Sequence, residues 1–149
     1  MENKIFFEGY RVDYINFRAN SLFKNESFDI GINPTYAIRV FLTDHEDVFK
    51  LSIECSLFKN IPSDKRPFDL NVIVEGMFKV DVSDKEKRES LLQYNGVSVL
   101  MPYLRATVAQ VTGTSGFPQI NLPLIYLDDL YKKAKNIVKD GKNTEEANK

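Results

Sequence analysis

The chain has 149 residues, a length typical of one domain and sufficient to bury a core without metal or disulfide support. Its 20 Lys and Arg residues nearly balance its 21 Asp and Glu residues, which argues against binding nucleic acid or anionic membranes through net charge. One cysteine and one histidine exclude an intrachain disulfide and an ordinary zinc site. The amino-terminal residues contain no apolar run of signal-peptide length, and no segment is long and apolar enough to span a membrane, so we expect a cytoplasmic protein.

Four segments show the alternation of apolar and polar residues that is typical of β-strands. They are residues 10–22, 36–42, 48–58 and 68–82. The short turns between the last three favour an antiparallel meander with one solvated face. Gly76 lies inside the fourth segment, where it indicates a bulge or a close backbone approach. The connection over residues 23–34 mixes turn formers with aromatic residues, and connections of this length are often functional.

The pattern then changes to that of a long helix. A first part is predicted over residues 84–94, and Asn95-Gly96 is expected to end it. A second part is predicted over residues 99–112, which places Pro102 in the first turn, where its missing N–H carries no cost. The stripe that this second part should bury consists of Leu100, Leu104, Val108 and Val111.

The last part of the chain combines an irregular apolar segment with a short helix and a polar tail. Residues 113–127 are interrupted by glycine and proline, and Asp128 is expected to cap a helix that runs to about Val138. Residues 139–149 are polar and are expected to be disordered. The sequence therefore predicts one α+β domain over residues 1–138. This fold is a four-stranded antiparallel meander sheet packed with a long helix, broken near Asn95-Gly96, and a shorter C-terminal helix.

Candidates for catalysis and metal binding are few. His45 lies in an acidic turn that is more typical of a solvated hairpin than of a catalytic site. Cys55 alternates with polar neighbours, as expected of a small core residue. Asp84 and Glu86 fit helix capping better than metal binding, and no Gly-rich loop joins a strand to a helix. We therefore expect no enzyme activity, no metal and no cofactor.

The two irregular segments, residues 23–34 and 113–127, are the most informative part of the sequence because they are unusually apolar. They either seal the core or line an apolar groove for a polypeptide. Pro118 and Pro123 cannot join a helix or a sheet ladder, which favours an open groove. The candidate binding residues are Phe23, Phe28, Ile30, Tyr36, Phe117, Ile120, Leu122, Leu124, Tyr126 and Tyr131.

An ordered set of short motifs accompanies these segments. The motifs are Gly76-Met77-Phe78, Met101-Pro102-Tyr103-Leu104-Arg105, the run from Gly116-Phe117-Pro118 to Pro123, and Asp128-Asp129-Leu130. Together they resemble the SecB family of bacterial protein-export chaperones, which has Gly-x-Phe, Phe-Pro-Tyr-Ala-Arg, a Gly-x-Phe-Pro loop and Asp-Ala-Leu at similar places. The order of elements agrees from residue 10 to residue 131, and the motifs are most specific from residue 98 onward.

The resemblance implies an ATP-independent holdase that assembles as a dimer of dimers and binds unfolded precursor polypeptides between the two irregular segments. It also implies docking of a translocase motor ATPase on acidic residues of the sheet, but Asn20, Lys24 and Asn71 stand at those positions here. Export is the leading function. A relative dedicated to another client, such as the antitoxin of a toxin–antitoxin pair, and a small-ligand-binding domain stay open. A dimer or tetramer is also predicted because the helix over residues 99–112 is apolar on much of its circumference.

Overall fold

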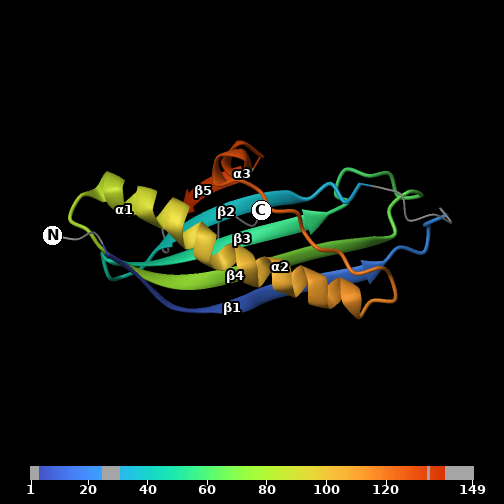
Figure 1. The fold of residues 1–149 in the computed structure, drawn as a ribbon, viewed down its shortest axis with the longest axis horizontal. Helices are drawn as coiled ribbons and strands as arrows, with labels where there is room; N and C mark the ends of the chain where they lie inside the picture. Colours follow the sequence, from blue (N-terminus) through green and yellow to red (C-terminus); the bar gives the residue numbers. More distant parts are fainter. Residues whose placement is uncertain (1–3, 25–30, 134, 140–149) are drawn as a thin grey trace.

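The computed structural model describes residues 4–24, 31–133 and 135–139 as one sheet with a long helix across one face (Figure 1). The strands are β1 (Lys4–Ala19), β2 (Thr35–Leu42), β3 (Val48–Leu57), β4 (Phe68–Asp81) and β5 (Lys135–Lys139). The helical elements are α1 (Lys85–Leu91), the π-helical turn η1 (Leu92–Gly96), α2 (Val97–Gly113) and α3 (Leu127–Lys133). The α+β class and the antiparallel pairing of the first four strands are confirmed.

The strand order is β1-β4-β3-β2-β5, which differs from a simple meander at both ends. β1 pairs antiparallel with β4 from Lys4↔Asp81 to Ala19↔Phe68, so the first strand lies beside the fourth and not beside the second. The C-terminal helix ends at Lys133 instead of continuing to Val138. β5 follows it and pairs in parallel with β2, which agrees with the β propensity of its Ile-Val pair.

Gly76 allows the helix to approach the sheet closely. A Cβ atom at this position would lie 2.7 Å from Leu100 Cδ2, and the β3–β4 register continues through it without a shift. The close approach is therefore confirmed and the bulge is not. The register shifts lie in β1, one of them between Phe7 and Gly9, where Gly9 has a φ of 134° that favours glycine.

The long helix is continuous, so the predicted break at Asn95-Gly96 is wrong. The chain passes from α1 through η1 into α2, and Gly96 has helical backbone angles. A Cβ atom on Gly96 would lie 2.9 Å from Leu51 Cδ2, so this glycine serves close packing against β3 rather than helix termination. Pro102 consequently lies inside α2 and not in a first turn.

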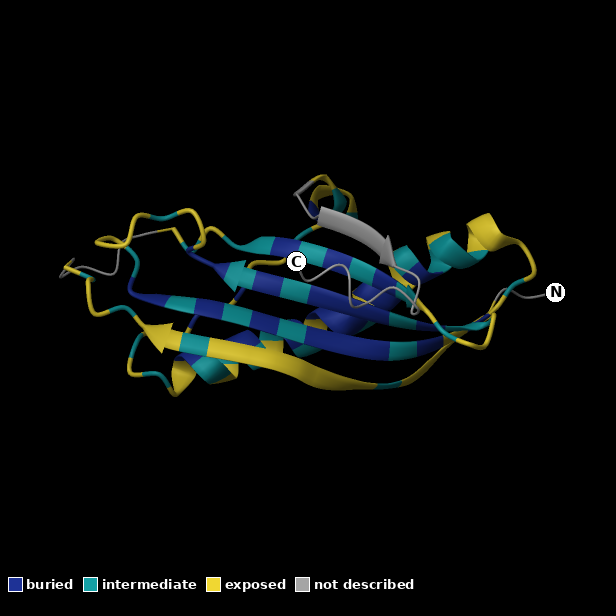
Figure 2. Ribbon diagram, turned by 180° about the vertical axis from the view of Figure 1, so that it is seen from behind, coloured by how far each residue is buried: buried dark blue, intermediate teal, exposed yellow. Residues whose placement is uncertain are grey.

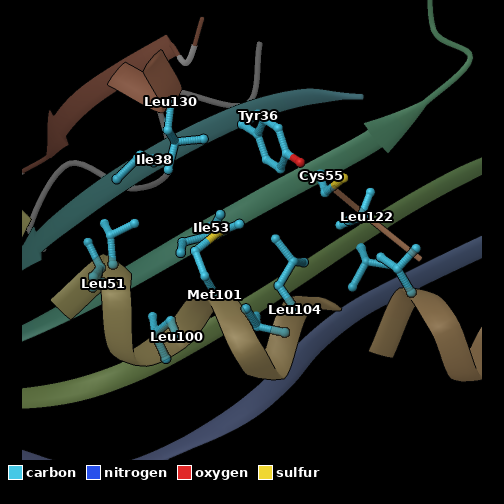
Figure 3. Close-up of a cluster of buried hydrophobic side chains, with 14 of the residues drawn as sticks. Tyr36, Ile38, Leu51, Ile53, Cys55, Leu100, Met101, Leu104, Leu122 and Leu130 are labelled. Carbon is cyan, nitrogen blue, oxygen red and sulfur yellow. The ribbon is translucent and has the colours of Figure 1, made fainter. Parts of the chain in front are cut away.

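The core lies between the sheet and α2, with α3 beside it (Figure 3). Leu100, Leu104 and Val108 are fully buried as predicted, whereas Val111 is only partly buried. Cys55 is a buried free cysteine, which confirms its assignment to the core. Loss of solvent there, and the nearby Glu54 charge, raise the pKa of the Cys55 thiol to about 12.

Candidate functional site

The loop between α2 and α3, residues 114–126, is held to α2 at its middle. The Thr112 side chain is fully buried, and its Oγ1 accepts a hydrogen bond from the Ile120 backbone N–H at 2.9 Å. Arg105 Nε donates to the Leu122 carbonyl at 3.2 Å. Ile120 and Leu122 are themselves buried in the core. This part of the loop is therefore a fixed element of the fold despite its irregular backbone.

The same loop is also held at its far end by α3. Leu130 is fully buried, and the Tyr131 hydroxyl donates to the Gln93 carbonyl in the π-helical turn. The Tyr131 ring lies 5.6 Å from the ring of Tyr94. Burial, and to a smaller extent Tyr94, raise the pKa of Tyr131, so its hydroxyl keeps the proton that it donates.

Between these two anchored regions the chain presents apolar side chains to solvent. Leu124 and Tyr126 are 85% and 84% exposed. Beside them lies a groove of about 210 Å³ between α2 and the loop. The groove is lined by Ser98, Met101, Pro102, Arg105, Pro123, Leu124, Ile125 and Leu127. A polypeptide side chain that entered this groove would meet mostly hydrocarbon, with the Ser98 hydroxyl and the Arg105 guanidinium as its polar side-chain groups.

A second aromatic group lies where the loop after α2 meets one end of the sheet. Phe117 is half-buried, and its ring lies 5.2 Å from that of Phe68. Phe17 and Phe58 also pack on Phe68, with ring separations of 4.9 and 5.1 Å. The Phe58 backbone N–H donates to the carbonyl of Ile32 in the connection before β2. The structure thus brings the ends of both predicted irregular segments to the same end of the sheet (Figure 1).

The predicted binding residues fall into four groups by exposure. Leu124 and Tyr126 are exposed; Phe23, Phe117 and Tyr131 are half-buried; Tyr36, Ile120 and Leu122 are buried; and Phe28 and Ile30 lie outside the described residues. Tyr36 is enclosed enough that burial raises its pKa to about 12. The buried group belongs to the hydrophobic core, and contact of any of these residues with a polypeptide stays a prediction.

Sequence reasoning missed the helix side of this groove. Met101, Pro102 and Arg105 line it from α2, and Tyr94 lies 44% exposed near Tyr131. The signal that could have found them is the Met101–Arg105 motif itself, because its residues at helical spacing do not all belong to the buried stripe.

The edge strand β1 carries a second exposed apolar surface, and Figure 2 shows this strand open to solvent along most of its length. Its exposed apolar residues are Phe6, Phe7, Tyr10, Val12, Tyr14 and Ile15. The Tyr10 ring stacks on the ring of Tyr103 from α2 at 3.8 Å, so this surface continues from the strand onto the helix. An apolar edge strand of this length is a template for pairing with another chain.

The face of the sheet that is turned away from α2 carries charged side chains that pair with one another. Glu54 accepts hydrogen bonds from Arg39 and Asn71, both at 2.8 Å. Partial burial would raise the pKa of Glu54, but these two hydrogen bonds and the Arg39 charge outweigh it and lower that pKa. Glu75 is similarly paired with Arg11 and Lys50. Asn71, one of the positions implied for motor docking, therefore serves an internal network here.

Within the part of the chain that the structure describes, no group of three or more His, Cys, Asp or Glu residues is arranged to hold a metal ion. No helix in the same residues combines the length and the hydropathy needed to cross a membrane.

Comparison with known proteins identifies the family of this chain. The model of the family described as preprotein translocase subunit SecB matches residues 14–137. An uncharacterized protein of Methanocaldococcus jannaschii is 28% identical over 120 residues, which cover 80% of this chain and 77% of the relative. The protein-export protein SecB of Anaplasma phagocytophilum is 27% identical over 70% of this chain, and that of Aromatoleum aromaticum is 23% identical over 58%. The matches span 65% and 55% of those two export proteins.

The fold is also shared with a solved structure. The Mycobacterium tuberculosis SecB-like chaperone, solved in complex with a ChAD peptide from the HigA1 antitoxin, superposes with a TM-score of 0.63 at 15% identity. The superposition covers 82% of this chain and 88% of that one. Because the family model spans most of the chain, this protein belongs to the SecB family.

Proposed function

We propose that this protein is an ATP-independent chaperone that binds unfolded polypeptides along the groove beside Leu124 and Tyr126. The observation that carries the proposal is the exposure of these two large side chains, 85% and 84%, on a loop that is anchored on both sides of them. A fixed loop cannot withdraw its apolar residues into the core. Covering each by a partner is worth about 1.5–3 kcal/mol.

The chemistry of the groove supports sequence-tolerant binding. Its lining is mainly aliphatic, and such contacts need no strict hydrogen-bond geometry. Met101 adds an adaptable side chain to the floor. The antitoxin peptide carried by the M. tuberculosis relative supports a polypeptide rather than a small molecule as the occupant. No enzymatic activity is proposed for this site.

A longer client would reach beyond this groove to the aromatic group around Phe117. Phe23 and Phe117 are half-buried, and each leaves part of a ring surface available. We include Phe28 and Ile30 from the connection before β2 as further contacts on the basis of the sequence. Tyr36, Ile120 and Leu122 would contribute mainly by holding the groove in shape.

Two client classes are compatible with this site. The names of the export proteins among the relatives support precursors that await secretion, which would place the activity in the cytoplasm. The pairing of Asn71 with Glu54 supports the alternative of a dedicated client, since the implied motor-docking position presents no acid. Co-purification of the translocase motor ATPase, or of one dedicated partner, separates the two classes.

We further propose that the protein forms a dimer or tetramer. The support is the exposed apolar residues of β1, which lie beside Tyr103 on α2. A second copy paired along this edge would satisfy the free strand edge and cover these residues together.

The holdase proposal is tested by aggregation of an unrelated denatured protein without nucleotide. Wild-type protein should suppress aggregation, and Leu124→Ser combined with Tyr126→Ser should weaken client binding about tenfold or more. Leu42→Ser is the matched control because Leu42 is also exposed but lies away from the groove. The unfolding midpoints of all variants should agree. Failure of the wild-type protein to protect several clients in excess would contradict the proposal.

A further inference from the structure

The two edges of β2 are paired very differently. One edge pairs antiparallel with β3 along the whole strand, from Thr35↔Ser56 to Leu42↔Phe49. Within the described residues, the other edge pairs in parallel with β5 from Ala37↔Lys135 to Phe41↔Lys139. Parallel pairing is slightly less stable per residue than antiparallel pairing. The outer edge of β2 is therefore covered by a short strand in the weaker arrangement.

β5 is also easy to displace on grounds of connectivity. It follows α3 after a single residue (Figure 1). Among the described strands, β2 is the neighbour of β5 in the sheet and none lies on its far side. β5 can therefore leave without breaking any other pairing between described strands. Short elements at the edge of a sheet open at a lower free energy than the core of a protein.

The helix α3 connects the proposed groove with β2. α3 begins immediately after Tyr126, and its Leu130 packs above Ile38 of β2 (Figure 3). A polypeptide held at Leu124 and Tyr126 therefore needs to extend only past the seven residues of α3 to reach this edge. That edge offers backbone N–H and C=O groups, which pair with any extended sequence.

We propose that the outer edge of β2 is a docking site for an extended segment of bound polypeptide, and that β5 occupies it in the free chaperone. This inference rests on the proposed holdase function and names its binding mode. β5 competes with the client for this strand edge, and its effective concentration is high because it belongs to the same chain. A client therefore pairs with β2 only when it also binds in the groove. An apolar segment that binds the groove weakly does not displace β5. A client that binds the groove tightly displaces it and adds a strand to the sheet.

The test locks β5 in place in the full-length chain with the pair Ala37→Cys and Lys135→Cys. These residues are register partners, and neighbouring strands lie about 4.8 Å apart, within the range that a disulfide bridges. Cys55 is buried and does not compete for oxidation. Binding of reduced, carboxymethylated α-lactalbumin, a permanently unfolded probe, is measured in the oxidised form and again after mild reduction. We expect the oxidised form to bind about tenfold more weakly.

Proline substitutions in β5 have the opposite purpose, because they weaken its pairing with β2 and free the outer edge of β2. Ile137→Pro and Val138→Pro are made separately, because alternate residues of a strand direct their N–H groups to one neighbour and one variant must lose a ladder hydrogen bond. That variant should bind the probe several-fold more tightly than wild type.

Equal binding by the oxidised and reduced forms would overturn strand docking while leaving the holdase function intact. A proline variant that gains mass by light scattering but no affinity for the probe would also overturn it, since a second copy would then fill the edge. Absence of binding by wild type and by every variant would instead refute the holdase function.

Discussion

The buried Oγ1 atom of Thr112 lies 2.9 Å from the backbone nitrogen of Ile120 and accepts its hydrogen bond. The same hydroxyl donates to the Val108 carbonyl at 2.8 Å, so one side chain joins the loop to the helix that bears it. The two residues are eight positions apart in the sequence, so their hydrogen bond closes the first part of the loop. Leu124 and Tyr126, further along the same loop, are exposed.

Replacement of Thr112 by Val should therefore destabilise the fold. The variant keeps the shape of the side chain but leaves the buried Ile120 N–H without its acceptor, which costs about 1–3 kcal/mol. Thr107→Val is the control, because the Thr107 hydroxyl bonds only within the helix, to Tyr103. Urea denaturation measures both variants. A difference between them below about 0.5 kcal/mol would contradict the anchoring role.

A charge on the helix-facing side of β1 should disrupt the proposed oligomer. Ile15 is 47% exposed and lies opposite Val72 on this side of the sheet. Ile15→Lys would place like charges near each other across a two-fold interface and would remove apolar area. Light scattering at micromolar concentration should give an oligomer for wild type and a smaller species for the variant. Leu42→Lys, at an exposed position on β2, should leave the mass unchanged; a monomeric wild type would refute the assembly.

An acid at position 71 should destabilise the sheet. Asn71 Nδ2 donates to Glu54 Oε2 at 2.8 Å and to Ser56 Oγ at 2.7 Å. Asn71→Asp removes both bonds and places a second carboxylate beside Glu54, at a cost of about 1–3 kcal/mol at neutral pH. The loss should shrink below pH 4, where carboxyl groups become protonated. Asn60→Asp in the turn after β3 is the exposed control, and equal effects of the two changes would contradict the network.

Alkaline pH should reveal the burial of Cys55. Its pKa is raised from 9.0 to about 12 in the folded chain, so the folded state holds the proton more tightly than the unfolded state. The stability from this group is complete below pH 9 and falls as pH rises from there toward 12. Denaturation between pH 7 and pH 11 should show a slope steeper for wild type than for Cys55→Ala by up to about 1.4 kcal/mol per pH unit. Identical slopes would show that the thiol is not protected.

The sequence by itself determined the central strands and the buried face of α2. The central strands β2, β3 and β4 were predictable because side chains in a strand alternate between a core face and a solvent face. The burial of Leu100, Leu104 and Val108 was predictable because every fourth residue of a helix returns to one face. Family motifs in the sequence also indicated which loop to examine. These signals are local, and local periodicity is retained whatever the rest of the chain does.

Only the tertiary structure decided features that depend on contacts distant in sequence. Asn95-Gly96 reads as a helix end, yet Gly96 continues the helix because Leu51 of β3 leaves no room for a Cβ atom. β1 pairs with β4 and β5 pairs with β2, and in each case the two partners are not consecutive in the sequence. The exposure of Leu124 beside the burial of Leu122 follows from the anchors on α2 and α3. Such partners lie far away in the sequence, so no periodicity within the loop records which of its apolar residues they cover.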